Sequence, residues 1–162
     1  LIIKGILDAE DALLAAKTGA DAIIVSNHGG RQLDGASSTI NILPEIVDKV
    51  GKLIEVHIDG GIRSGQDVVK AMCLGAKGTY IGRAFLYGLG ALGKEGVTKA
   101  LDIIKTEADM TMALCGRRDV HDLNHDNILR PFFDDESINH LLFQLKDLPT
   151  SIGVYHIGQL LF

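Results

Sequence analysis

The sequence lacks the features that mark several classes of protein. It has 2 cysteines, Cys73 and Cys115, too few for a disulfide scaffold, and both lie in apolar helical patterns that favour buried thiols. It has 3 prolines, so its 19 glycines do not indicate a Pro/Gly-rich disordered chain. No apolar run reaches the roughly 18 residues that a membrane span needs, and no signal peptide is visible. We therefore expect a globular protein in a reducing cytoplasm.

Net charge narrows the choice of partners. The 162 residues include 16 Lys and Arg against 21 Asp and Glu, which gives a formal charge of −5. This balance argues against a nucleic acid or an anionic membrane surface as the main partner, although a local basic site remains compatible with it. Because the sequence starts at Leu1, without methionine and inside a predicted strand, we expect a fragment.

Four strand-then-helix units follow one another along the chain. Predicted strands cover residues 1–6, 22–26, 53–58 and 78–81, and predicted helices cover residues 8–18, 41–50, 64–74 and 89–114. Asp8 and Ser64 stand where helix N-caps are expected, and Asp67 completes a capping-box pattern with Ser64. This alternation predicts an α/β fold with a parallel sheet, either doubly wound or part of a (β/α)8 barrel.

The pattern changes near the C-terminus. We expect a domain over residues 1–130 and a tail over residues 131–162, with a short helix near 137–146 followed by an apolar stretch.

The loop of residues 26–34, SNHGGRQLD, carries the densest signal for chemistry. It follows a buried strand, at the end where barrel enzymes place their catalytic groups. His28 can exchange a proton near neutral pH, and Arg31 can bind a carboxylate through two parallel hydrogen bonds. Gly29 and Gly30 allow the sharp turn that brings these two side chains together. A solvated surface loop is the alternative interpretation.

Two glycine turns follow the last two predicted strands. In residues 59–65, DGGIRSG, small residues let backbone N–H groups approach an anion, Arg63 adds a charge, and the helix starting near Ser64 directs its positive end at the same place. Gly82 and Arg83 repeat the pattern one unit later. Because barrels often bind phosphate after strands seven and eight, these turns predict a phosphate site.

Three further positions require interpretation. Lys4 lies in an apolar strand, so we expect it to face an anionic partner near the strand's end. His57, inside a strand, is interpreted as structural. His121 and His125 have i, i+4 spacing without the glutamate of a zinc-protease motif, so we expect no metal site.

The motifs together resemble one family. Residues 4–6 (KGI), 26–34, 59–65 and 82–85 (GRAF) resemble the FMN-dependent α-hydroxy-acid dehydrogenases and oxidases, and residues 86–116 are most similar to bacterial L-lactate dehydrogenases. The resemblance covers about residues 1–130 and implies the C-terminal half, strands five to eight, of an FMN-binding (β/α)8 TIM barrel. It implies oxidation of an L-2-hydroxy acid such as L-lactate to the 2-oxo acid.

The same resemblance assigns roles to residues. His28 would be the catalytic base, and Arg31 would bind the substrate carboxylate. FMN would be held by eight positions in three groups. Lys4 would lie by the N1/O2 edge of the flavin, Ser26 would contact the ring, and Asp59, Gly60, Gly61, Arg63, Gly82 and Arg83 would bind the ribityl chain and phosphate.

Departures from the family limit what the resemblance implies. Strands one to four, which carry the remaining substrate and flavin contacts, are not in this sequence, and residues 131–162 do not fit the family pattern. The chain is thus expected to be a homo-oligomer or to need the missing half, with a quinone, a cytochrome or oxygen as electron acceptor. A catalytically inactive FMN- or phosphate-binding half-barrel is the alternative. The location expected is cytoplasmic, with peripheral attachment to the inner face of the cytoplasmic membrane as a variant. FMN-dependent isopentenyl-diphosphate isomerase and inosine-monophosphate dehydrogenase are less compatible with the His28/Arg31 pair.

Overall fold

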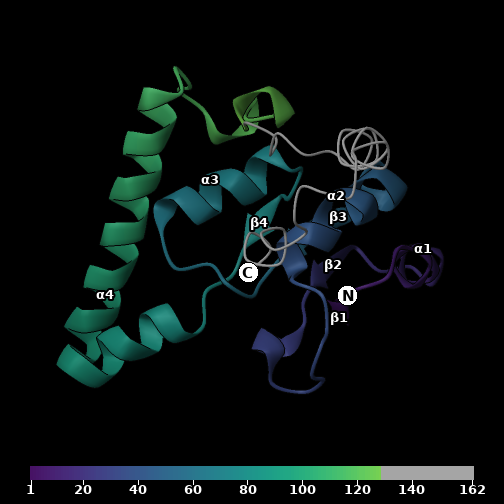
Figure 1. Cartoon of the computed structure of the whole chain (residues 1–162), viewed down its shortest axis with the longest axis horizontal. Helices are drawn as coiled ribbons and strands as arrows, with labels where there is room; N and C mark the ends of the chain where they lie inside the picture. The colour runs from purple at the N-terminus through teal and green to yellow at the C-terminus, as the bar shows by residue number, and fades with distance from the viewer. Residues whose placement is uncertain (129–162) are drawn as a thin grey trace, which may run out of the picture. The chain divides into compact units, whose positions relative to one another are not determined.

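The computed structural model describes residues 1–128 (Figure 1). The strands are β1 (Ile2–Ile6), β2 (Ala22–Val25), β3 (Glu55–Ile58) and β4 (Gly78–Thr79); the helices are α1 (Ala9–Lys17), α2 (Thr39–Val50), α3 (Gly65–Cys73) and α4 (Arg83–Leu114). Three short 3-10 turns are η1 (His28–Gly30), η2 (Val120–Asp122) and η3 (His125–Asn127). The helix and apolar stretch predicted within residues 131–162 lie outside the described residues.

The strands form a parallel sheet in the order β1-β2-β3-β4, so each strand pairs with its successor in the chain. Lys4 stands opposite Ile24, Ile24 opposite His57, and His57 opposite Gly78. The register of β1 against β2 shifts between Lys4 and Ile6, where Gly5 adopts a φ of 98°. This irregularity lies directly beside the lysine that the sequence singles out.

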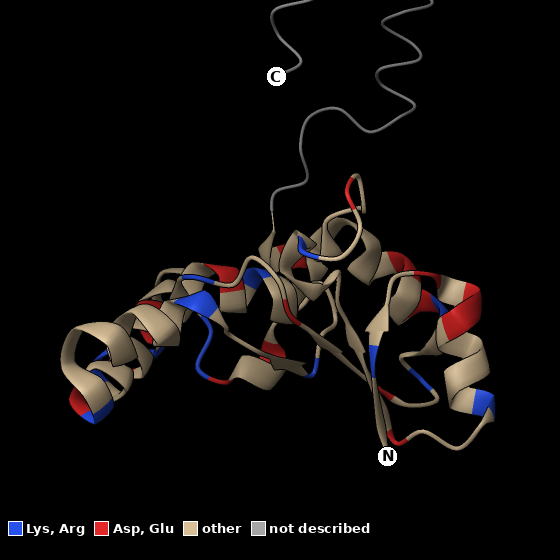
Figure 2. Cartoon of the chain, turned by 90° about the horizontal axis from the view of Figure 1, so that it is seen from below, with Lys and Arg blue, Asp and Glu red and all other residues tan. Residues whose placement is uncertain are grey.

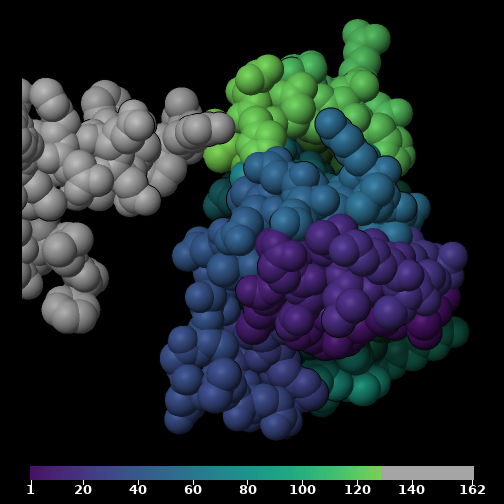
Figure 3. All heavy atoms as spheres, turned by 90° about the vertical axis from the view of Figure 1, so that its right-hand side faces the viewer, coloured from purple at the N-terminus to yellow at the C-terminus, as the bar shows by residue number. Residues whose placement is uncertain are grey.

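The hydrophobic core lies between the sheet and its helices. Ile23 and Val25 of β2 and Val56 and Ile58 of β3 are at most 1% exposed and pack with α1 and α2. Right-handed crossovers between sequential neighbours place consecutive helices on the same face of a parallel sheet. Figure 1 shows the helices in the order α4, α3, α2, α1 across the molecule. In Figure 3 the N-terminal residues, in purple, lie against the blue region that includes α2. We call the helix-covered side the outer face and the side of Lys4, Ile24 and His57 the inner face.

Local capping explains where two helices begin. The Asp8 carboxylate accepts hydrogen bonds from the backbone N–H groups of Glu10 (2.8 Å) and Asp11 (3.1 Å). The predicted capping box at Ser64 and Asp67 is also formed. The acidic first turn and Lys17 in the last turn of α1 suit its macrodipole, and Figure 2 shows red at one end of this helix and blue at the other.

Helix α4 starts earlier than predicted and is bent. The pattern predicts a helix from residue 89, whereas α4 begins at Arg83 and turns at Leu92 and Gly93, where the dihedral angles are not helical. Beyond the bend the chain folds back so closely that a Cβ on Gly96 would lie 1.8 Å from the Gly88 carbonyl oxygen. The glycines that obscure the helical period in the sequence are therefore the residues that permit this turn.

The two cysteines differ in environment. Cys73, at the end of α3, is 1% exposed and packs with Val69 and Leu123, as predicted. Burial raises the pKa of its thiol. The prediction for Cys115 is wrong, because this residue follows the last turn of α4 and is exposed. No helix within residues 1–128 is long and apolar enough to cross a membrane.

Candidate active site

A cavity of about 530 Å³ opens where the strands end and the following loops begin. Lys4 comes from β1, His28 and Arg31 from the loop after β2, Asp59 and Arg63 from the loop after β3, and Arg83 from the start of α4. Because the four strands are parallel, their carboxyl ends lie at the same end of the sheet. The six side chains, which are far apart in sequence, meet there. The structure therefore brings these six predicted residues together around one cavity.

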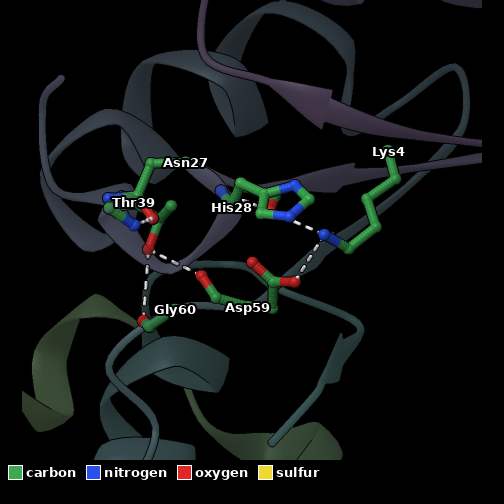
Figure 4. Close-up of polar contacts among 8 residues, drawn as sticks. Lys4, Asn27, His28, Thr39, Asp59 and Gly60 are labelled. Atoms are coloured by element: carbon green, nitrogen blue, oxygen red, sulfur yellow. Dashed lines mark hydrogen bonds and ion pairs between the residues drawn. The ribbon is translucent and has the colours of Figure 1, made fainter. Parts of the chain in front are cut away.

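Lys4 is the central polar residue of the cavity. Its ammonium lies 2.9 Å from the carboxylate oxygen Oδ2 of Asp59 and donates a 2.9 Å hydrogen bond to the Ser26 hydroxyl. Figure 4 shows Lys4 reaching toward Asp59, with the imidazole of His28 beside this ion pair. The expectation that Lys4 faces an anionic group is confirmed, and the group is Asp59.

Ser26 connects the lysine to the histidine loop. It is 2% exposed and accepts a 3.2 Å hydrogen bond from the backbone N–H of His28. His28 itself has a φ of 57°, unusual for a residue with a side chain. Gly29 and Gly30 continue in the same left-handed region, with φ values of 68° and 70°. The two glycines thus provide the sharp turn that the sequence predicts, and the Asn27 side chain caps it through the Gly30 N–H at 3.2 Å.

His28 and Arg31 are both exposed and both line the cavity. Neither makes an ion pair within residues 1–128, so both can reach a ligand that enters the cavity. A base beside a guanidinium is an arrangement that can bind a carboxylate and accept a proton from an adjacent hydroxyl group.

The turn after β3 is fixed by a residue that the sequence analysis did not select. The hydroxyl of Thr39, the first residue of α2, donates to the carbonyl oxygen of Asp59 at 2.7 Å (Figure 4). This buried contact explains why α2 begins at Thr39 rather than at Asn41. Gly60 has a φ of 86°, and a Cβ there would lie 3.1 Å from the Asn27 amide oxygen, so the turn requires glycine.

The helix whose N-terminus is open to an anion is α4 and not α3, which the sequence predicts. The N–H of Gly65, at the start of α3, donates to the Glu107 carboxylate at 2.8 Å, and Ser64 and Asp67 cap the neighbouring N–H groups. The start of α4 has no side-chain cap, and Gly82 and Arg83 there line the cavity. The positive helix end available to an anion is therefore that of α4.

The charges of the cavity favour an anion. Lys4, Arg31, Arg63 and Arg83 line it with one carboxylate, that of Asp59, although the whole chain carries a charge of −5. The second oxygen of Asp59, Oδ1, is buried and has no hydrogen-bond partner among residues 1–128. Such an oxygen can accept a hydrogen bond from a ligand hydroxyl.

Sequence reasoning missed a second polar group, on the inner face. The imidazole of His57 lies 3.0 Å from the Tyr80 hydroxyl through Nδ1 and 3.0 Å from the Glu55 carboxylate through Nε2. The rings of His57 and Tyr80 also stack, with centroids 5.7 Å apart. A Cβ at Gly78 would come within 3.1 Å of the imidazole, so this glycine makes room for it. His57 thus has the structural role predicted. His121 and His125 lie in the turns η2 and η3.

Comparisons with known proteins agree with this geometry. A model of the FMN-dependent dehydrogenase family matches residues 1–130. The chain is 56% identical over 124 residues to the L-lactate dehydrogenase of Caulobacter vibrioides (strain NA1000 / CB15N), which covers 76% of this chain and 32% of that protein. It is 49% identical over 128 residues to the peroxisomal (S)-2-hydroxyacid oxidase GLO3 of Arabidopsis thaliana, covering 79% and 35%.

Solved structures give the same result. A soluble mutant of the membrane-associated (S)-mandelate dehydrogenase from Pseudomonas putida superposes with a TM-score of 0.78 at 46% identity, covering 81% of this chain and 37% of that chain. The chain belongs to the FMN-dependent dehydrogenase family. It spans about a third of the length of the L-lactate dehydrogenases that it matches.

The residues present fit a phosphorylated, hydroxyl-bearing cofactor such as FMN. Arg63 and Arg83 offer charge to a phosphate, and the exposed backbone at Gly61 and Gly82 has open space where a Cβ would stand. The unpartnered oxygen of Asp59 suits a hydroxyl of the ribityl chain.

Proposed function

We propose that this chain supplies strands five to eight of an FMN-dependent (β/α)8 barrel that oxidises an L-2-hydroxy acid, in the first instance L-lactate, to the 2-oxo acid. The observation that carries the proposal is the meeting of His28 and Arg31 with the Lys4–Asp59 pair and two further arginines around one cavity. The family membership and the L-lactate dehydrogenases among the relatives support it.

In this proposal some residues of the cavity bind the substrate and others bind the cofactor. Arg31 binds the substrate carboxylate through its planar guanidinium and so orients the adjacent hydroxyl-bearing carbon. His28 accepts the hydroxyl proton. FMN, when bound, would take up the two electrons that leave the substrate. Lys4 would stabilise negative charge gained by the cofactor, and Ser26 would contact its ring.

The remaining residues hold the polar end of the cofactor. Asp59 and Gly60 would bind ribityl hydroxyls, and the phosphate would lie between the loops after β3 and β4. Gly61, Arg63, Gly82 and Arg83 are the groups that bind it there.

A second candidate function is binding without catalysis. It is favoured by one observation: every predicted phosphate ligand lies within this chain, whereas the chain spans about a third of its relatives. In that case the chain binds FMN or phosphate as a half-barrel and does not turn over a hydroxy acid.

Cofactor binding tests both candidates. We expect the purified chain to bind FMN more tightly than riboflavin, which lacks the phosphate, and Arg63→Ala and Arg83→Ala to weaken FMN selectively. Lys99→Ala, an exposed cation on α4 outside the cavity, is the matched control. Equal affinities for FMN and riboflavin in a fluorescence titration would contradict the phosphate assignment.

Catalysis is tested in the complete barrel, formed with the first part of the Caulobacter relative. His28→Gln should keep FMN bound and slow its reduction by lactate by at least about a hundredfold, the lower range for a positioned base. Arg31→Lys should raise KM for lactate and lower kcat together, because the bidentate contact is lost. Reduction at the parent rate by His28→Gln would reject the assignment. If the parent barrel binds FMN but does not oxidise lactate, the result supports the second candidate function, binding without catalysis.

The location and the electron acceptor belong to the same proposal. We infer a cytoplasmic enzyme or one attached peripherally to the inner face of the cytoplasmic membrane, and a quinone, a cytochrome and oxygen stay open as acceptors. The membrane-associated mandelate dehydrogenase among the similar structures supports peripheral attachment.

A further inference from the structure

We propose that Thr39 and Asn27 are positioning residues that lock the loop carrying His28 and Arg31 to the turn after β3, so that a cofactor bound at the turn also holds the loop in place. We call the contacts of Thr39 and Asn27 the lock. This inference rests on the proposed function, which assigns the turn to the cofactor and the loop to the substrate. It adds two residues that do not line the 530 Å³ cavity, and it predicts that cofactor and substrate binding are coupled.

Thr39 holds the turn from outside the cavity. It is 2% exposed and, with Ser26, is one of the two buried polar side chains among residues 1–128. Its hydroxyl donates to the carbonyl oxygen of Asp59 at 2.7 Å, and the carbonyl oxygen of Gly60 lies 3.3 Å away. Ser38, at the N-cap of α2, makes no side-chain capping bond. The start of α2 is therefore held by the turn after β3 through the Thr39 hydroxyl.

Asn27 holds the loop at both of its ends. Its amide oxygen accepts a hydrogen bond from the Gly30 N–H at 3.2 Å, and its amide nitrogen donates to the Ser37 carbonyl oxygen at 3.3 Å, two residues before Thr39. A Cβ on Gly60 would lie 3.1 Å from the Asn27 amide oxygen and 3.2 Å from the Thr39 hydroxyl oxygen, so the turn packs against both side chains (Figure 4). One network of contacts thus runs from Gly30 to the turn.

Asp59 links this network to the cavity. Its carbonyl oxygen binds Thr39, whereas its carboxylate pairs with Lys4, which also binds the Ser26 hydroxyl. Ser26 in turn accepts a hydrogen bond from the His28 N–H. The loop is therefore connected to Asp59 by two routes, one along the cavity and one through the lock.

The loop has a conformation that needs support. His28 has a φ of 57°, which a residue with a side chain keeps only where its surroundings hold it. Neither His28 nor Arg31 makes an ion pair within residues 1–128, so their positions depend on the backbone contacts of the loop. A cofactor hydroxyl on the unpartnered Oδ1 of Asp59 would fix that residue and, through the lock, the loop. Because coupling between two ligands is reciprocal, the substrate would also favour the cofactor.

Amide hydrogen exchange of Gly30, followed by NMR in the purified full chain with and without FMN, tests the proposal. Thr39→Val removes the hydroxyl at similar volume. Without FMN, the Gly30 amide should exchange at least about threefold faster in this variant, the scale of one lost hydrogen bond. FMN should slow the exchange by at least about fivefold in the parent and by less than about twofold in Thr39→Val, because the coupling is lost.

Three further variants complete the test. Thr39→Ser keeps the hydroxyl and should behave as the parent does. Thr106→Val is the matched control, because Thr106 of α4 is exposed and its hydroxyl also donates to a backbone carbonyl oxygen, that of Asp102 at 2.8 Å. Asn27→Ala breaks the other end of the lock and should also abolish the effect of FMN on Gly30. It is the second variant should Thr39→Val fold poorly by circular dichroism.

The amides of α1 distinguish positioning from general stability. Loss of the FMN effect in Thr39→Val, with Thr39→Ser and Thr106→Val as the parent and α1 unchanged in all, supports the lock. An unchanged Gly30 amide in Thr39→Val, or equal acceleration in α1, would overturn it. An FMN effect that persists in Thr39→Val would also overturn it, since FMN would then only cover the loop.

Failure of the lock and failure of the proposed function are separable. If FMN binds to the parent in a fluorescence titration without slowing the exchange of Gly30, the coupling is rejected and the proposed function stands. If FMN does not bind, the phosphate assignment is contradicted, and the exchange of Gly30 without FMN still decides whether Thr39 holds the loop.

Discussion

The two faces of the sheet are built from the same strands and follow opposite principles. On the outer face, side chains such as Ile23 and Val56 are almost completely buried and apolar. On the inner face, alternate residues of the same strands form polar clusters around Lys4 and His57. One face therefore buries apolar side chains against the helices, whereas the other carries ion pairs and hydrogen bonds between polar side chains.

The largest difference should appear when one isoleucine is truncated on each side. Ile23→Ala removes a fully buried side chain from the outer face and should lower the free energy of unfolding by about 2–5 kcal/mol. Ile2→Ala, at 51% exposure on the edge strand β1, should change it by about 0.5 kcal/mol or less. Urea titrations followed by circular dichroism measure both. Similar losses would mean that the inner side is also packed in solution.

The thiols sharpen the comparison between buried and exposed positions. Since burial raises the pKa of Cys73, less of its reactive thiolate is present at any given pH, whereas Cys115 is exposed. We expect iodoacetamide to label Cys115 at least about tenfold faster, because its thiol is exposed whereas that of Cys73 is buried. Peptide mass analysis identifies the site. Equal rates in the native state would show that the α3 environment opens readily.

Removing the central cation of the inner face should have a smaller effect on stability. Lys4→Met leaves Asp59 without its ion-pair partner and should cost about 1 kcal/mol, since Lys4 is partly exposed. Lys49→Met, which breaks the exposed pair with Glu10, is the control and should cost about 0.5 kcal/mol or less. Both losses are read from denaturation midpoints at low and high salt. Identical losses would place the Lys4–Asp59 pair among ordinary surface contacts.

The smallest effect on stability is expected from the contact between His57 and Tyr80 on the inner face. Tyr80→Phe removes the hydroxyl that bonds His57 but keeps the stacked ring, so stability should fall by about 1 kcal/mol or less. Tyr87→Phe, on an exposed tyrosine of α4, should be neutral and serves as the control. The NMR chemical shifts of the His57 ring protons should change in Tyr80→Phe and not in Tyr87→Phe.

Local chemistry made much of the fold predictable. Asp8 and Ser64 cap their helices as their sequence positions suggest, and the apolar run after Asp21 is the central buried strand. Residues of the site were predictable because the motifs are contiguous, and the parallel topology then brings Lys4, His28 and Arg83 to one edge.

What escaped prediction depends on contacts between distant residues. Glu107 caps α3 from 42 residues away, which no local pattern reveals. Thr39 starts α2 early because its hydroxyl binds the loop after β3. The exposure of Cys115 follows from where α4 ends, and the apolar sequence around it gave no sign of that.

The sequential strand order also determines how the molecule can assemble. Each strand pairs with the one made just before it, so the sheet can grow one β/α unit at a time as the chain is synthesised. The cavity cannot follow the same course, because Lys4 comes from the first unit and Arg83 from the last. Its formation therefore reports that all four units are in place, so the cavity is complete only at the end of folding.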